Sequence, residues 1–418
     1  MCMNMKKKLI LVESEMIGPK GHFLNNLIDI TKTFENKFKI SWLLNSKFTD
    51  EGTYIPRKVK ILKSIMTNTY TRNTNKILYI FEEIFLFILN IFNIIFFLFF
   101  FLKEKNVKNY IYALKSNYFL LPKYFKSFYF VYRKLKLTKD DHIFFPTARR
   151  KDIALINFIT KIDYKHPKFH IRVFLPPKNK FKGFFYYLKE IDDVLKKNRA
   201  FVYLWSNYNF NLFMKNSISK INIFKSNIPW SFYNRRFKTK NHIVGFVGDA
   251  RLARGFNLLP KIIKLLERSN TEFRYLIHFS KISNDLIDTK NELYKMSKKN
   301  KKIKIIEKYA DYKEFINYLK KIDIMPILHK TKEINAVTSG TLYSCIPYQI
   351  PLVVPAGTEF MKDIQKHKSY LEAKSINEIA YNIIKISKKY SFYLKNMKLN
   401  SKILKEILKK DPLRKNLI

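Results

Sequence analysis

The chain has 418 residues, and its 80 lysines and arginines outnumber its 33 aspartates and glutamates, which gives a formal net charge of +47. With 47% hydrophobic and 16% aromatic residues, it is too apolar to be a disordered basic tail and long enough for two or three domains. Its only cysteines are Cys2 and Cys345, and no Cys/His cluster has zinc spacing, which excludes a disulfide framework and a structural zinc site.

The first half of the chain alternates short apolar runs with segments of helical period. The apolar run before Glu13 is too short for a secretory signal, so we interpret it as a cytosolic strand. Apolar residues at helical spacing follow it from Phe23, and again from Ile153. Alternating strands and helices indicate a parallel sheet covered on both faces, here over residues 1–228. The predicted strands are 8–13, 39–44, 109–114, 142–146, 170–176 and 201–205.

Residues 84–102 form an apolar run interrupted only by Asn90 and Asn93. The run is long enough to cross a bilayer as a helix. Three placements remain open: a helix inserted into or lying on a membrane surface, a helix buried in the domain, and a membrane span. A span would cut the N-terminal domain in two, so we favour surface association.

A second alternating series begins near residue 242, after a stretch that has Pro229, few strand formers and several charges. We place a linker at 229–241, a second α/β domain at 242–385 and a basic helical tail at 386–418. The predicted strands of the second domain are 242–248, 273–279, 302–309, 323–328 and 351–356, and its predicted helices are 256–267, 312–321 and one from about 341.

The chain has only nine glycines, and seven lie in or beside strand-to-helix turns, where ligands bind in open α/β sheets. The first such turn, VESEMIGPKGHF, has Gly18 and Gly21 before a helix that starts near His22. His22 is our first candidate for a general base, because its ordinary pKa lies near working pH. Glu13 and Glu15 are the other candidates, and a flexible loop with a surface histidine is the alternative interpretation.

The second turn, GFVGDARLARGFNLLP, ends a strand at Gly248 and places Arg251 and Arg254 before Gly255 and a helix. Two arginines beside a helix N-terminus would bind a diphosphate through bidentate hydrogen bonds. The alternative is a solvated basic turn.

The third turn opens a short helix with Ser339, Gly340 and Thr341, which supplies a hydroxyl and free N–H groups suited to phosphate. Simple helix capping is the alternative. Two anion-suited turns in one domain, opposite a glycine turn in the other, favour an active cleft.

The stretches GFVGDARLARGFNLLPKI and SGTLYSCIPYQIPLVVPAGT resemble the C-terminal domain of GT-B-type glycosyltransferases, in their group-1, retaining-type branch. The resemblance covers about 242–360 and little of the first half. It implies two Rossmann-like domains that face each other across a cleft, with the acceptor on the N-terminal side and a nucleotide-sugar donor on the C-terminal side. In this family an Arg and a Lys/Arg-Gly pair contact the donor diphosphate, and Arg251 and Arg254 occupy comparable places. The family's base contacts fall in the loop that contains Tyr309, which we expect either to stack on the base or to pack in the core.

The chain departs from the family pattern in two places. The usual Gly-Arg step is Gly248-Asp249, so the arginine is displaced by two positions. Many retaining members carry two glutamates eight residues apart, and the corresponding positions hold Ala336 and Ser344, in a variant loop with Ser-Gly-Thr.

Other chemistries lack a motif. No Asp-x-Asp, Gly-x-Ser-x-Gly, Walker A or His-Glu-x-x-His occurs, so we expect a metal-independent transferase without a cofactor, in which cationic side chains and helix N-termini stabilise the leaving diphosphate.

The basic charge leaves the choice of partner partly open. Lys, Asn, Ile and Phe are all abundant, as in A/T-rich coding sequences, so part of the charge is compositional. The remainder favours an anionic membrane surface and nucleotide phosphates. Nucleic acid is not expected, because no zinc-finger, RNP or KH signature is present.

We expect a glycosyltransferase acting on a glycan or lipid-linked acceptor in cell-surface polysaccharide biosynthesis, peripheral on the cytoplasmic face of the membrane. The alternatives are a catalytically silent GT-B scaffold and a protein that binds nucleic acid or another anionic polymer.

Overall fold

The computed structural model describes residues 6–18, 22–49, 54–65, 121–163, 165–173, 195, 199–204, 207–216, 221–226, 232–238, 240–269, 271–329, 340–358 and 366–418. The apolar segment 84–102, the predicted strand 109–114, Gly21 and Ser339 lie outside these ranges. None of the helices within them is both long and apolar enough to cross a membrane.

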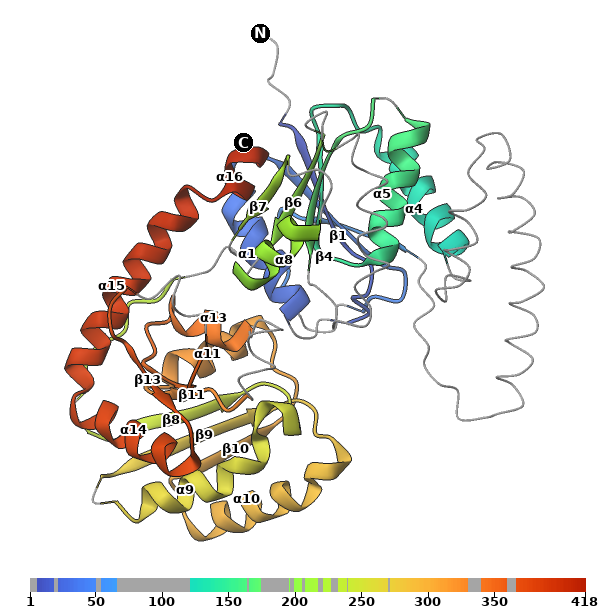
Figure 1. The fold of residues 1–418 in the computed structure, drawn as a ribbon. Helices are drawn as coiled ribbons and strands as arrows, with labels where there is room; N and C mark the ends of the chain where they lie inside the picture. Colours follow the sequence, from blue (N-terminus) through green and yellow to red (C-terminus); the bar gives the residue numbers. More distant parts are fainter. Residues whose placement is uncertain are drawn as a thin grey trace, which may run out of the picture.

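The first half of the chain forms a seven-stranded parallel sheet with the order β3-β2-β1-β4-β5-β6-β7 (Figure 1). Its strands are β1 (Lys8–Glu13), β2 (Lys39–Asn45), β3 (Lys60–Ile65), β4 (His142–Ala148), β5 (Lys168–Val173), β6 (Ala200–Leu204) and β7 (Ile223–Lys225). Consecutive residues of β1 alternate between the two faces of the sheet, because side chains in a strand have a period of two. Ile10 and Val12 join one core cluster, and Leu9 and Leu11 join the other.

Helices cover both faces of this sheet, as a parallel sheet requires. Helices α4 (Leu121–Leu135), α5 (Arg150–Ile162) and α8 (Asn207–Asn216) supply Phe128, Ile153 and Phe213 to one cluster. Helix α1 (His22–Phe34) supplies Leu27 to the other, and so does the last helix of the chain, α16 (Pro412–Leu417), through Leu413.

The second half contains six parallel strands in two three-stranded groups, β10-β9-β8 and β11-β12-β13. The strands are β8 (His242–Val247), β9 (Phe273–Phe279), β10 (Ile303–Glu307), β11 (Met325–Pro326), β12 (Leu352–Pro355) and β13 (Tyr370–Ala373). A parallel bridge between Val244 and Ile324 joins the groups, and the Gly245 N–H donates to the Ile324 carbonyl at 3.0 Å. The combined order is therefore β10-β9-β8-β11-β12-β13.

The helices of this half are α9 (Leu259–Glu267), α10 (Ile287–Lys299), α11 (Tyr312–Lys321), α13 (Gly340–Cys345), α14 (Ile376–Lys388) and α15 (Tyr390–Lys409). The helix expected over 256–267 begins as α-helix only at Leu259, because short 3₁₀ turns occupy Leu252–Arg254 and Phe256–Leu258. The helix expected at about 341 begins at Gly340.

The predicted α/β class with two parallel sheets is confirmed, with differences at the sheet edges. The strands β3, β7 and β13 were not predicted, and each lies at an edge of its sheet. The predicted strand 323–328 contracts to Met325–Pro326.

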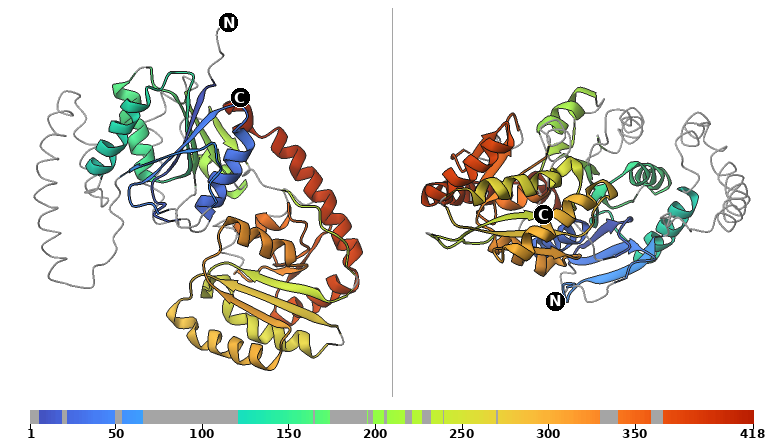
Figure 2. Two further views of the ribbon diagram at one scale, coloured as in Figure 1. Left: turned by 180° about the vertical axis from the view of Figure 1, so that it is seen from behind. Right: turned by 90° about the horizontal axis from the view of Figure 1, so that it is seen from below.

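The two halves are connected a second time by the C-terminal helices. Helix α15 runs from the second half back to the first, where α16 packs (Figures 1 and 2). The Ser226 hydroxyl donates to Asp411 Oδ1 at 2.5 Å, and Leu417 is 1% exposed in the first core. The segment expected as a basic tail thus completes the first hydrophobic core.

Direct contacts also join the halves. The Tyr312 hydroxyl, at the start of α11, donates to Asp29 Oδ1 on α1 at 2.7 Å. The Tyr312 ring stacks on Tyr54 at 6.5 Å between centroids, and the Lys32 ammonium lies 4.6 Å from the Tyr312 ring centroid.

Candidate functional site

Each sheet reverses its strand order at one place, and ligands of open α/β sheets bind beside such a reversal at the carboxyl ends of the strands. In the first sheet the reversal lies between β1 and β4, and in the second between β8 and β11. The first two predicted turns follow β1 and β8. Both therefore lie at the positions where ligands bind in sheets of this kind.

The turn after β8 is built around two glycines in the left-handed region. Gly248 has φ of +133° and Gly255 has φ of +68°. A Cβ on Gly248 would lie 2.6 Å from Arg254 Nη1, and one on Gly255 would clash with the Leu328 carbonyl oxygen. Glycine at both positions lets the Arg254 guanidinium lie against the Gly248 backbone, and lets the chain after β11 pack on the turn.

Arg254 is the available cation of this turn. None of the described residues accepts a hydrogen bond from its guanidinium or pairs with it within salt-bridge distance. Burial lowers its pKa despite the opposing influence of Asp249, but a guanidinium stays protonated at neutral pH. A partly buried arginine without a hydrogen-bonding partner is suited to an anionic ligand.

Arg251, which we expected to act with Arg254, already has a partner. Its Nη2 lies 2.6 Å from Asp249 Oδ2, and its side chain is 58% exposed. Asp249 also accepts a hydrogen bond from the Ser280 hydroxyl at 2.7 Å. Burial opposes ionisation of Asp249, but Ser280 and the two guanidinium groups outweigh it and lower its pKa. Asp249 therefore holds Arg251 in an ion pair.

The third turn places a hydroxyl group beside Gly248. The Thr341 hydroxyl would lie 3.9 Å from a Cβ on Gly248, and it is 3.5 Å from the Val247 carbonyl. A Cβ on Gly340 would meet no atom of the described residues within 4 Å, so these residues leave space beside it. The structure brings Gly248, Arg254 and Thr341 together, while Ser339 lies outside the described residues.

His329 lies three residues after β11 and was not predicted from the sequence. Its Nδ1 is buried and has no hydrogen-bond partner among the residues that the structure describes. Burial lowers its pKa to about 4, and the positive charge of Arg254 lowers it further in the same direction. The imidazole is therefore neutral at pH 7 and sits within the field of Arg254. The sequence could not predict that His329 lies near Arg254, because a single histidine forms no motif. The two residues come together because Leu328 packs on Gly255.

Tyr309 follows β10, an edge strand, and is 36% exposed, so it is not a core residue. The Lys281 ammonium lies 6.0 Å from its ring centroid. The Lys281 carbonyl accepts a hydrogen bond from the Ala250 N–H at 2.8 Å. Lys281 therefore lies between Tyr309 and the turn after β8.

The turn after β1 places Glu13 and Glu15 in opposite environments. Glu13 is 2% exposed, and burial raises its pKa to about 8, with nearby Asp152 adding to the rise and Arg172 opposing it. Glu15 pairs with Lys151 on α5, and its Oε2 lies 3.8 Å from Arg149 Nη1. Burial disfavours the Glu15 carboxylate, but these cations outweigh burial and lower its pKa. Two neighbouring carboxyls with pKa values shifted apart are typical of acid–base pairs.

The other residues predicted on the acceptor side, Gly18, Gly21 and His22, lie only partly within the described part of the chain. Gly18 is buried, and its φ is not in the left-handed region. His22 is the first residue of α1, although its side chain is not among those described. In the described ranges, no three His, Cys, Asp or Glu side chains lie close enough together to hold a metal ion.

Known structures share this architecture over nearly the whole chain. Sucrose-phosphate synthase from Thermosynechococcus elongatus matches with a TM-score of 0.60 at 9% identity, over 96% of this chain and 95% of that one. An α,α-trehalose-phosphate synthase from Burkholderia xenovorans, in complex with glucose-6-phosphate, matches with a TM-score of 0.56 at 10% identity, over 96% and 99%.

Anabaena HepE in complex with UDP and glucose matches with a TM-score of 0.55 at 12% identity, over 96% and 95%. No protein-family model and no curated protein sequence matches the chain. These likenesses show that the chain has the GT-B fold of nucleotide-sugar glycosyltransferases.

Proposed function

We propose that the protein is a metal-independent glycosyltransferase that moves a sugar from a nucleoside diphosphate sugar to a glycan or lipid-linked acceptor in cell-surface polysaccharide biosynthesis. The main support for this proposal is the position of the Arg254 guanidinium. It lies against the Gly248 backbone, beside the strand reversal of the second sheet, and no described residue accepts a hydrogen bond from it.

A departing nucleoside diphosphate develops negative charge as the bond to the sugar breaks. A preorganised guanidinium lowers the energy of that charge without reorganising during the reaction. Thr341 supplies a hydroxyl beside Gly248, and the open space at Gly340 leaves room for the donor. The bound UDP and glucose of the HepE structure support the same class of donor.

On the acceptor side, Glu13, Glu15 and His22 are the proposed catalytic candidates. A pKa of about 8 places Glu13 near working pH, where proton transfer is efficient, but its side chain is almost fully buried. The Glu15 side chain is 25% exposed and ion-paired with Lys151, which favours the carboxylate and weakens it as a base. Lys151 and Arg149 would attract an anionic acceptor to the same edge.

The proposed site of action is the cytoplasmic face of the membrane, supported by the apolar run 84–102 and the charge of +47. Deleting Phe97–Phe101 from the full chain is expected to reduce its sedimentation with anionic vesicles. Unchanged sedimentation of the folded deletion variant would remove this part of the proposal.

A catalytically silent GT-B scaffold is the second candidate. Ser344 occupies the position of one family glutamate, and its hydroxyl donates to the Gly340 carbonyl at 2.8 Å inside α13. A buried hydroxyl engaged in this way does not replace a carboxylate.

A thermal-shift screen against UDP-, GDP-, dTDP- and CMP-sugars tests the proposal, with the bare nucleotides as controls. A ligand at about 100 times its dissociation constant stabilises the folded state by about 2.7 kcal/mol. We expect one nucleotide family to raise the melting temperature, and the corresponding sugar donor to be consumed when acceptor is added. Stabilisation without turnover would favour the scaffold, and no shift with any nucleotide would contradict donor binding.

A further inference from the structure

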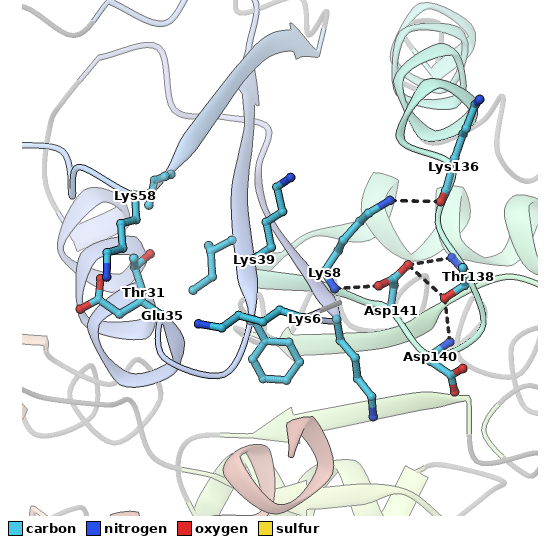
Figure 3. A pocket seen from close by; sticks show the side chains of 14 residues that line it. Lys6, Lys8, Thr31, Glu35, Lys39, Lys58, Lys136, Thr138, Asp140 and Asp141 are labelled. Atoms are coloured by element: carbon cyan, nitrogen blue, oxygen red, sulfur yellow. Dashed lines mark hydrogen bonds between the residues drawn. The ribbon is translucent and has the colours of Figure 1, made fainter. Parts of the chain in front are cut away.

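A pocket lies at the end of the first sheet where strands β1, β2, β3 and β4 begin, opposite the end that carries the turn after β1. It encloses about 780 Å³, within the range of small-molecule sites. In a parallel sheet all strands begin at one end of the sheet and finish at the opposite end. This pocket is therefore separate from the turn that follows the carboxyl end of β1. Figure 3 shows lysine side chains from several segments around it. Its lining residues include Lys6, Lys7, Lys8, Lys39, Lys58 and Lys136.

Five of these six lysines have no carboxylate partner among the described residues. Lys8 is fixed in the wall, because its ammonium donates to the Leu135 carbonyl at 2.9 Å and to the Lys136 carbonyl at 3.2 Å. The other five make no salt bridge with any residue that the structure describes, and all five are exposed. Their positive charge is therefore available to a ligand.

The pocket holds three carboxylates, of which one is fully engaged. Asp141 accepts from the Lys8 backbone N–H at 2.7 Å, and from the Thr138 N–H and hydroxyl at 2.8 and 3.1 Å. Glu35 and Asp140 remain, so five unpaired lysines face two unpaired carboxylates. The positive charge of the lysines also affects a neighbouring histidine. Burial lowers the pKa of His142, at the start of β4, to about 4, and the charges of Lys168 and Lys7 add to this effect.

The floor of the pocket is apolar. Phe38 and Ile40 line it and are 5% and 3% exposed, and Val59 completes the apolar part. The Phe38 ring packs edge-on against His142 at 5.4 Å between centroids, which fixes this floor. A ligand that fits would combine several negative charges with an apolar body or a sugar face.

We propose that this pocket binds a phosphate ester, held by Lys39, Lys58 and the lysines at the start of β1, independently of the donor turn. The same chemistry could come from a soluble phosphorylated metabolite or from a phospholipid headgroup. The proposal does not rest on the proposed function, because no residue of the pocket belongs to the donor or acceptor turns.

The test uses the full chain carrying Arg254→Ala, so that the donor turn contributes little to anion binding. The pocket variant adds Lys39→Gln and Lys58→Gln, and the matched control adds Lys295→Gln and Lys298→Gln on the exposed face of α10. Both pairs remove two positive charges from exposed positions, so neither is expected to unfold the protein. The probes are inorganic tripolyphosphate, by calorimetry, and phosphatidylcholine vesicles containing phosphatidic acid, by sedimentation.

We expect the pocket variant to bind at least one probe roughly tenfold more weakly or worse, and the control variant to bind it as the parent does. Loss with tripolyphosphate alone would identify a soluble ligand, and loss with vesicles would identify a lipid headgroup. Equal weakening in both variants would overturn the proposal, since binding would then follow net charge. Absence of binding of both probes to the parent would also overturn it.

Discussion

Arg251 and Arg254 are three residues apart, yet their side chains have different surroundings in the structure. Arg251 is exposed and ion-paired with Asp249, whereas the Arg254 guanidinium has no hydrogen-bonding partner among the described residues. Exposed ion pairs contribute only about 0–1 kcal/mol. We therefore predict that Arg251→Ala weakens donor binding by less than about fivefold, as measured by calorimetric titration. A loss as large as that of Arg254→Ala would show that both arginines bind the diphosphate.

Glu13 makes the first half of the chain sensitive to pH. Its pKa is raised from the model-compound value of 4.5 to about 8, so the folded state holds a proton that the unfolded state releases between these values. The stability that Glu13 contributes is complete below about pH 4.5 and is lost as pH rises toward 8. We predict that Glu13→Gln stabilises the protein at pH 8 by on the order of a few kcal/mol and changes little at pH 4.5. Thermal unfolding at both pH values checks this, and a variant equally stabilised at both would contradict the assigned pKa.

The residues of the candidate site could be predicted from the sequence only where a glycine marked the turn. In so glycine-poor a chain, Gly248 and Gly255 indicated a place of close backbone approach, and both have positive φ. The pairing of Arg251 with Asp249 and the proximity of His329 to Arg254 could not be predicted, because they depend on contacts between different segments.

Structural and binding roles in the candidate site can be separated by substituting two glycines, Gly255 in the turn after β8 and Gly340 at the start of α13. Gly255→Ala would place a Cβ against the Leu328 carbonyl in a left-handed conformation, so we predict a marked loss of thermal stability. The Cβ of Gly340→Ala would meet no atom within 4 Å in the part of the chain that the structure describes, so we predict nearly unchanged stability but weaker donor binding. Melting temperatures with and without nucleotide distinguish the two. If Gly340→Ala bound donor normally, the open space would lie outside the site.

Strand prediction succeeded where both faces of a strand are buried. The strands β1, β2, β4, β5 and β6 are buried along nearly their whole length and are rich in apolar residues, as expected in the interior of a parallel sheet. The missed strands β3, β7 and β13 are edge strands, which are short or interrupted by polar residues because one side lacks a neighbouring strand.

The C-terminal segment connects the two domains in a way that composition did not reveal. The periodicity predicted helices, but the return of α16 to the first core depends on tertiary contacts of Leu413 and Leu417. We predict that Leu417→Ala destabilises the first domain by about 2–5 kcal/mol, as large-to-small core substitutions do. Ile418→Ala, next in sequence and 53% exposed, is the control and should have little effect. Urea unfolding followed by tryptophan fluorescence, to which Trp42 in the same core contributes, compares them. Equal stability of the two variants would mean that α16 does not dock in solution.

In the proposed function, the turn after β8 binds the diphosphate of the donor. Calorimetric titration of a nucleoside diphosphate and the monophosphate of the same base, into the wild-type chain and Arg254→Ala, tests this directly. We predict that the wild-type protein binds the diphosphate about 10- to 100-fold more tightly than the monophosphate, and that Arg254→Ala loses most of this difference. An undiminished preference for the diphosphate in Arg254→Ala, or no preference in the wild-type protein, would contradict the assignment.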